Sequence, residues 1–230
     1  MIFNKLVLVR HGESLWNKEN KFTGWTDIDL SKHGKKESIN AVKKLKKNKF
    51  LFDIAYTSML TRAIHTLWIL LYKLNLSWIP VKKSWRLNER HYGYLQGMNK
   101  ELAIKKYGIK KIQKWRRSVN SLPPEINIHD KRFPGKEIRY SNLDKKYLPL
   151  SESLLLTIKR IFPYWKKEIL PKIKNGSKII IVAHGNSIRS LIKIIDNLSE
   201  DNLEKLNIPT AKPLIYEFDK NIKPINKYYI

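Results

Sequence analysis

Two apolar runs of the chain have the same pattern, and each ends at a histidine followed by glycine. Residues 6–9 are followed, after one arginine, by His11, and residues 178–183 run directly into His184. Short apolar runs rich in β-branched residues are typical of buried strands. Open α/β sheets bind ligands at the carboxyl ends of their strands. If the two strands are parallel neighbours, both imidazoles lie at one edge of the sheet.

Apolar residues at helical spacing predict a helix over about 35–47, with Ser31 placed to cap it and Ile39 on its inner face. A second, longer helix is expected to begin at a cap on Ser58. Asn75 is placed to end that helix in a left-handed conformation.

The remaining pattern continues the alternation of strands and helices. In the helix that opens after residues 151–153, Phe162 is expected to face inward and Pro163 to bend the axis. The other expected elements are helices near 100–107, 109–117 and 187–197, and strands near 53–57, 78–81 and 214–218, the last of which completes the sheet. This order predicts an α/β fold of three layers, a mostly parallel sheet with helices on both faces.

The chain is expected to form a single domain over residues 1–230. Between about 86 and 150 the periodic pattern loosens, and Pro123-Pro124 interrupts it. Long ordered excursions from a compact domain are usually functional, so this segment is expected to contribute to an active site.

Composition narrows the class of protein. The formal net charge is +26, which would suit nucleic acid or an anionic membrane, but the lysines are scattered and Lys, Asn and Ile are frequent throughout. We therefore expect neither partner, although small polyanions would be attracted. There is no cysteine, no signal peptide is recognised, and no apolar run is long enough to span a bilayer, so a cytoplasmic enzyme is expected.

The arginines indicate the kind of ligand. The sequence has no phosphate-binding glycine loop, no dinucleotide fingerprint and no paired-histidine zinc motif. Arginines instead follow turns or strands at Arg10, Arg62, Arg90 and Arg116-Arg117. A guanidinium binds phosphate or carboxylate oxygens in pairs and keeps its charge, so phosphate chemistry without a metal is expected.

A histidine at such a site can accept a phosphoryl group if a carbonyl holds one ring nitrogen as N–H and leaves the other its lone pair. Gly12 would let the backbone approach the transferring group, and His184 could stabilise the same oxygens. Glu89 could move the proton of a substrate hydroxyl. Its alternative role is an ion pair with Arg90.

These residues resemble the histidine phosphatase superfamily and, within it, the cofactor-dependent phosphoglycerate mutases. The resemblance covers essentially the whole chain in order. Its motifs are Arg10-His11-Gly12-Glu13-Ser14 with Trp16-Asn17, Phe22-Thr23-Gly24-Trp25, Tyr56-Thr57-Ser58, Arg62-Ala63, Leu87 to Gly93, Trp115-Arg116-Arg117, Leu150 to Leu154, Ala183 to Ser187 and Asn207 to Thr210.

The resemblance implies a phosphoglycerate mutase-like fold and a role for each matching residue. His11 is the phosphorylated nucleophile, Glu89 the proton donor and acceptor, and His184 the stabiliser of the transition state. Arg10 and Arg62 hold the transferring phosphoryl group. The residues expected to bind substrate are Ser14, Asn17, Thr23, Gly24, Arg90, Tyr92, Lys100, Arg116, Arg117, Gly185 and Asn186.

The implied reaction interconverts 3-phosphoglycerate and 2-phosphoglycerate in glycolysis and gluconeogenesis, primed by 2,3-bisphosphoglycerate and without a metal. Small phosphoglycerates are the implied partners, and a homodimer the expected assembly. Such mutases usually continue past Tyr228-Tyr229 with a mobile tail, whereas this chain ends at Ile230. Less protection of the phosphohistidine from water is therefore expected. The alternatives are a phosphate-monoester hydrolase of the same fold and a non-catalytic polyanion binder.

Overall fold

The computed structural model describes residues 4–230, and the sheet it forms from them has six strands in the order β3-β2-β4-β1-β5-β6. Strands β1 to β4 pair in parallel, whereas β5 runs antiparallel to β1 and β6 antiparallel to β5. The bounds are β1 Asn4–Arg10, β2 Ile54–Thr57, β3 Val81–Lys83, β4 Ile179–Ala183, β5 Leu214–Phe218 and β6 Pro224–Tyr229. The predicted mostly parallel sheet is confirmed.

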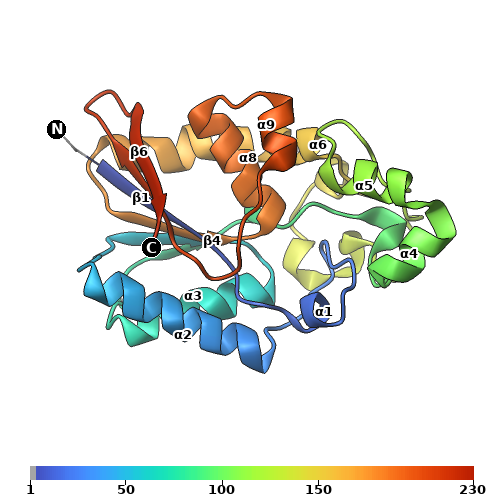
Figure 1. Ribbon diagram of the computed structural model, residues 1–230, viewed down its shortest axis with the longest axis horizontal. Helices are drawn as coiled ribbons and strands as arrows, with labels where there is room; N and C mark the ends of the chain where they lie inside the picture. Colours follow the sequence, from blue (N-terminus) through green and yellow to red (C-terminus); the bar gives the residue numbers. More distant parts are fainter. Residues whose placement is uncertain (1–3) are drawn as a thin grey trace.

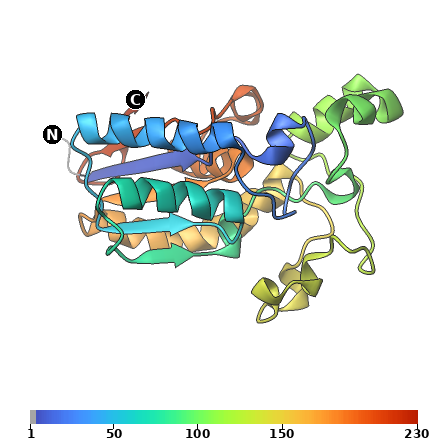
Figure 2. The same ribbon diagram turned by 90° about the horizontal axis from the view of Figure 1, so that it is seen from below.

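Helices cover both faces of this sheet, which confirms the three layers (Figures 1 and 2). On one face, α2 (Lys32–Lys47) and α3 (Thr61–Lys73) pack on Val7 and Val9 of β1 and on the β4 side chains of that same face. On the other, α6 (Leu154–Tyr164), α7 (Leu170–Lys174) and α8 (Gly185–Asp196) pack on Leu6 and Leu8. Because both faces are covered, residues 6–9 of β1 and the whole of β4 are continuously apolar rather than alternating.

The excursion predicted near 86–150 leaves the carboxyl end of the sheet and folds beside it (Figure 2). Its two α-helices, α4 (Lys100–Tyr107) and α5 (Ile109–Arg117), have the predicted bounds. Five short 3-10 turns make up its other regular structure, at Trp85–Leu87, Gly93–Leu95, Pro134–Lys136, Ile138–Tyr140 and Lys145–Tyr147. The other short helices of the chain are α1 (Leu15–Lys18) and α9 (Glu200–Lys205).

Several predicted boundaries were wrong. The cap of α3 is Leu60 rather than Ser58, whose hydroxyl accepts from the Leu60 N–H just before the helix. Ser31 does cap its helix, but α2 begins directly after it, and α8 begins at Gly185 rather than 187. Asn75 adopts the expected left-handed conformation, with φ of 58°.

The predicted inward positions were also wrong in two helices, because Ile39 and Phe162 are exposed. Pro163 lies inside α6, and a π-helical turn, Trp165–Ile169, follows it. The sheet does not end at 214–218, since β6 adds a mostly exposed edge strand. The strand expected near 78–81 begins only at Val81, as β3, because residues 78–80 belong to the turn before it. Within residues 4–230, no helix is long and apolar enough to cross a membrane.

Candidate active site

The two histidines predicted to meet do so at the carboxyl ends of β1 and β4. These strands are parallel neighbours in a register that pairs Arg10 with Ala183, so the next residue of each is His11 or His184. The His11 N–H donates to the Ala183 carbonyl at 2.9 Å. The two imidazole rings lie edge to face with centroids 5.0 Å apart.

The ring of His11 is held in one protonation state. Its Nδ1 lies 2.6 Å from the Gly12 carbonyl, which can only accept, so Nδ1 carries a hydrogen, and in the neutral ring Nε2 keeps its lone pair. Burial, together with the charges of Arg62 and Arg10, holds the pKa of His11 well below its usual value, against the raising effect of the Gly12 hydrogen bond. His11 is therefore a neutral imidazole with a free nucleophilic nitrogen.

The loop that carries His11 is packed too tightly against α2 for a side chain at Gly12 or at Gly34. A Cβ on Gly12 would stand 2.3 Å from the Gly34 carbonyl oxygen of α2, and one on Gly34 would stand 2.0 Å from the Glu13 carbonyl oxygen. The Gly12 N–H donates to the Thr66 hydroxyl of α3 at 3.1 Å. Two helices of the same face thus fix the loop that carries His11.

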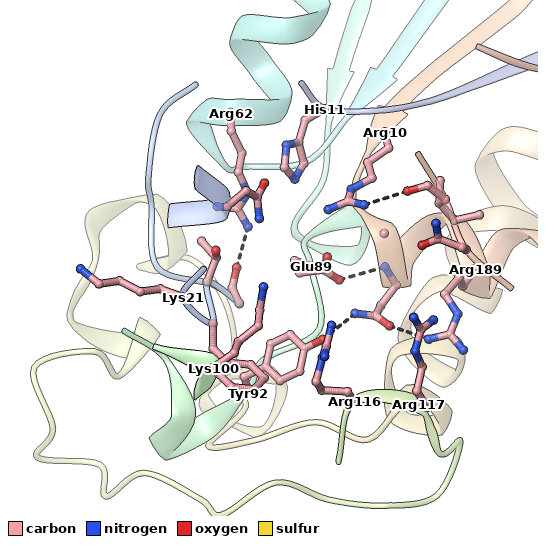
Figure 3. Close-up of a pocket in the computed structure, with 18 of the residues that line it drawn as sticks. Arg10, His11, Lys21, Arg62, Glu89, Tyr92, Lys100, Arg116, Arg117 and Arg189 are labelled. Atoms are coloured by element: carbon pink, nitrogen blue, oxygen red, sulfur yellow. Dashed lines mark hydrogen bonds between the residues drawn. The ribbon is translucent and has the colours of Figure 1, made fainter. Parts of the chain in front are cut away.

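Two arginines face His11 (Figure 3). Arg62 in the first turn of α3 is buried and donates to the carbonyls of Gly24 at 2.7 Å and Thr26 at 3.0 Å. Burial lowers the pKa of Arg62 to about 10. Arg10 donates through Nη1 to the Ile208 carbonyl at 2.7 Å, while its buried Nε has no hydrogen-bond partner in residues 4–230. The guanidinium charges are thus fixed in place by backbone carbonyls.

Glu89 lies between the two ends of the pocket, and one of its carboxylate oxygens is fully engaged. Its Oε1 accepts from the backbone N–H of Arg90 at 2.8 Å and of Asn186 at 3.1 Å. Asn186 is in the first turn of α8, whose amino end favours a negative charge. Oε2 remains available for proton transfer. The alternative of an ion pair with Arg90 is wrong, since the Arg90 guanidinium donates to the Tyr92 hydroxyl and the Arg116 carbonyl.

His184 is fully buried behind the pocket wall. Its Nε2 lies 2.8 Å from the Ser58 hydroxyl, whereas its buried Nδ1 has no partner within the described residues. Burial and the charge of Arg62 hold the pKa of His184 well below its usual value. His184 can therefore serve as a neutral hydrogen-bond donor beside His11.

The opposite end of the pocket gathers residues of the excursion. Tyr92, Lys100, Arg116 and Arg117 lie there, with Glu89 between them and His11 (Figure 3). Burial and the nearby charge of Arg116 lower the pKa of Lys100. The pocket thus has cationic groups at both ends, an arrangement that suits a small ligand with two anionic groups.

Most of the predicted site residues line this one pocket. They are Arg10, His11, Asn17, Thr23, Gly24, Arg62, Glu89, Tyr92, Lys100, Arg116, Arg117, Gly185 and Asn186. The structure places Ser14, Arg90 and His184 behind the lining. Ser14 is buried, and its hydroxyl caps α1 by accepting from the Asn17 N–H at 3.2 Å.

The pocket also contains residues to which the sequence assigned no role. They are Lys21, Phe22, Arg189, Leu206, Asn207 and Ile208. Arg189 had a signal, because it follows Gly185 by one helical turn and so lies on the same face of α8. No local pattern distinguishes Lys21 from the other lysines. In residues 4–230, no three His, Asp or Glu side chains are grouped so that they could hold a metal ion.

Comparison with known proteins identifies the family. The model of the histidine phosphatase superfamily (branch 1) matches residues 6–132. The chain belongs to the histidine phosphatase superfamily. It is also 59% identical, over 230 residues, to a 2,3-bisphosphoglycerate-dependent phosphoglycerate mutase from Baumannia cicadellinicola subsp. Homalodisca coagulata, covering 100% of this chain and 97% of that protein. Within the superfamily, the chain therefore belongs to the phosphoglycerate mutases.

Several solved structures share this fold at low sequence identity. Mycobacterial hydrolase 1 aligns with a TM-score of 0.73 and 21% identity, over 98% of this chain and 96% of that one. A mycobacterial glucosyl-3-phosphoglycerate phosphatase aligns with a TM-score of 0.72 and 21% identity, over 98% and 97%. YhfR of Bacillus stearothermophilus aligns with a TM-score of 0.70 and 21% identity, over 94% and 91%. These likenesses confirm the fold class.

The superfamily match ends before β4, so it includes His11, Arg62 and Glu89 but not His184. The sheet brings that second histidine to the site, because β4 is inserted between β1 and β2.

Proposed function

We propose that this protein interconverts 3-phosphoglycerate and 2-phosphoglycerate through a phosphohistidine at His11. The observation that carries the proposal is the neutral His11 ring, whose free Nε2 lies in a pocket with cationic groups at both ends. An intermediate with a phosphate at one end and a carboxylate or second phosphate at the other would be held while the phosphoryl group moves. The 59% identical relative, named as a mutase, supports the same reaction.

The pocket residues also fit 2,3-bisphosphoglycerate, which supplies the first phosphoryl group when bound. Among the residues that line the pocket, buried donors without partners in the described part of the chain are found at Arg10 Nε and the Thr23 hydroxyl. Unpaired buried donors are costly, so an oxygen-rich anion is the expected counterpart. Arg10 and Arg62 would hold the phosphate next to His11, and Lys100, Arg116 and Arg117 the opposite anionic groups.

The chain's own groups account for the transfer. His11 Nε2 attacks phosphorus, an N–P bond forms and the P–O bond to the donor oxygen breaks. Arg10, Arg62 and His184 stabilise the charge on the three equatorial oxygens. Glu89, through Oε2, gives a proton to the departing oxygen and takes one from the hydroxyl that next receives the phosphoryl group. The oxygen of that hydroxyl then attacks phosphorus, a new P–O bond forms and the N–P bond breaks, so His11 is again neutral with Nε2 free and Glu89 is again protonated.

We further propose that the working assembly is a homodimer. A face of α3 and the turn that leads from it to β3 present three exposed aromatic side chains, Trp68, Tyr72 and Trp78, and β3 is an edge strand of the sheet. Large exposed apolar patches mark interaction surfaces. Phosphoglycerates are the proposed partners and the cytoplasm the proposed location. Light scattering of the wild type and of Trp78→Ser tests the assembly, and a monomeric wild type would contradict it.

The reaction is tested by a coupled assay of 3-phosphoglycerate with and without 2,3-bisphosphoglycerate. Turnover that requires the bisphosphate, survives EDTA and is lost in His11→Ala is expected, because arginines and a neutral imidazole supply the required charges and nucleophile. His33→Ala, at an exposed histidine, is the matched control. Release of inorganic phosphate without isomerisation would favour the hydrolase alternative, and activity unchanged in His11→Ala would refute both.

A further inference from the structure

Arg189 is a buried arginine of the pocket whose hydrogen bonds are made to other groups of the protein. Its side chain is 4% exposed, and both Nε and Nη2 donate to the Leu203 carbonyl. The remaining nitrogen, Nη1, donates to Oδ1 of Asn186 at 3.1 Å, one turn earlier on α8. All three nitrogens of the guanidinium therefore donate to other groups of the protein.

This contact determines which way the Asn186 amide faces. A guanidinium has only donors, so the atom of Asn186 that meets Arg189 must be the oxygen. The amide nitrogen is then turned to the opposite side, where Nδ2 lies 3.1 Å from the Tyr92 hydroxyl. Without Arg189, nothing in this contact would prevent the amide from rotating by half a turn and presenting its oxygen to Tyr92.

The orientation of Asn186 in turn determines where the Tyr92 hydrogen points. The Tyr92 oxygen accepts from Asn186 Nδ2 and, on its other side, from Arg90 Nη2 at 3.1 Å. Both neighbours are donors, so the phenolic hydrogen must point toward a different acceptor. Tyr92 lines the pocket, and its hydroxyl lies at the end opposite His11 (Figure 3). The hydrogen is thus available to an anionic ligand.

We propose that Arg189 is a positioning residue that acts through the Asn186 amide to direct the Tyr92 hydroxyl hydrogen at the non-reacting anionic group of the substrate. This rests on the proposed function, since it assigns how that substrate is held. If the amide were reversed, Tyr92 would donate to Asn186, and the pocket would lose one donor at that end.

The charges at this end agree with a donor role for Tyr92. Burial by itself would raise the pKa of the Tyr92 hydroxyl, but the charge of Arg90 and the hydrogen bonds from Arg90 and Asn186 lower that pKa below its usual value. The Arg90 guanidinium also lies over the Tyr92 ring, 4.6 Å from its centroid. An acidified hydroxyl donates a stronger hydrogen bond to a carboxylate or phosphate oxygen.

A double-mutant cycle tests the proposal, with Arg189→Met, Tyr92→Phe and the two combined. Calorimetry measures the Kd of 3-phosphoglycerate, and steady-state assays separate KM from kcat. Each single variant is expected to weaken binding by about tenfold and to raise KM, with kcat within about twofold of wild type. The combined variant is expected to bind no more weakly than either single one, because both remove the same donor. Lys193→Met, which removes a charge from α8 outside the pocket, is the control.

The possible failures are separable. Losses that multiply in the combined variant would show that Arg189 contacts the substrate independently, and would overturn the proposal. An unchanged Kd in Tyr92→Phe, which removes only the hydroxyl, would overturn it even if Arg189→Met did not fold. If the wild type neither binds nor isomerises 3-phosphoglycerate, the proposed function itself fails, and this inference fails with it.

Discussion

His11 and His184 come from distant parts of the chain, yet their imidazole rings lie edge to face, 5.0 Å apart between centroids. The register of β1 and β4 produces this relationship, because each histidine is the first residue after paired strand ends. Both rings are buried among arginines, and the pKa of each is held well below its usual value. Two neutral imidazoles thus stand side by side, His11 as the proposed nucleophile and His184 as the proposed hydrogen-bond donor.

The first prediction concerns the protonation of His11. Burial and the charges of Arg62 and Arg10 lower its pKa, so the ring should remain neutral as the pH falls through 6.5. Removing a positive charge favours protonation, so Arg62→Gln should raise the pKa of His11 toward 6.5. NMR titration of the His11 imidazole measures its pKa in the wild type and in the variant. A wild-type midpoint near 6.5 would contradict the prediction, and Lys36→Gln, at an exposed position of α2, is the control.

The second prediction concerns the proton carrier. Glu89→Gln keeps an oxygen for the N–H groups of Arg90 and Asn186 but cannot take up a proton. We expect kcat for isomerisation to fall by about 100-fold or more with a smaller change in KM. The melting temperature should stay close to wild type, since the hydrogen bonds of Oε1 are retained. A kcat within a few-fold of wild type would assign proton transfer to another group.

The third prediction concerns the support behind Glu89. Buried Arg160 donates to both Glu152 oxygens and, through Nη2, to the carbonyls of Asn88 and Glu89, each at 2.9 Å. Arg160→Met would leave the Glu152 carboxylate buried without its cation. We expect a loss of about 3–5 kcal/mol in the free energy of unfolding, measured by urea denaturation. Lys146→Met, at the exposed pair with Asp144, should leave the midpoint of urea denaturation unchanged.

The fourth prediction concerns stability in acid. Burial, with the charges of Arg132 and Arg160, lowers the pKa of His91 from 6.5 to about 3, and its Nδ1 accepts from the Gly93 N–H. Above pH 6.5 the ring is neutral in both folded and unfolded chains. Below that value only the unfolded chain takes up the proton, so stability falls. His91 alone should account for about 2 kcal/mol between pH 7.5 and 5.

Urea denaturation of the wild type and of His91→Gln at the two pH values checks this. The variant should lose less stability on acidification than the wild type does. Equal losses in both proteins would show that His91 is protonated in the folded state or does not contribute.

The fifth prediction concerns the close packing of α2 on the nucleophile loop. Gly34 lies outside the pocket, but a Cβ there would stand 2.0 Å from the Glu13 carbonyl oxygen, two residues after His11. Gly34→Ala should cost about 1–3 kcal/mol of stability and also reduce kcat, because the loop must shift. Lys35→Ala, at the exposed neighbour, should do neither. Normal activity in Gly34→Ala would show that the loop tolerates the shift.

The sequence predicted the fold well where pattern and packing agree. Helices α4 and α5 were predicted with their observed bounds, and Ser31 caps α2 as expected. The prediction of buried positions failed at Ile39 and Phe162, because these apolar side chains are exposed. Strand β6 was missed because an edge strand that is mostly exposed carries little hydrophobic signal.

The sequence by itself determined the chemistry of this protein, because two apolar strands ending in His-Gly and a set of arginines after turns are local features. Only the tertiary structure decided which side chains work together. It placed Arg90 behind the wall and Arg189 in the pocket, gave Glu89 Oε1 two N–H donors, and set the Tyr92 hydroxyl between Arg90 and Asn186. Such contacts join residues far apart in the chain, and their hydrogen-bond directions depend on packing that no local pattern records.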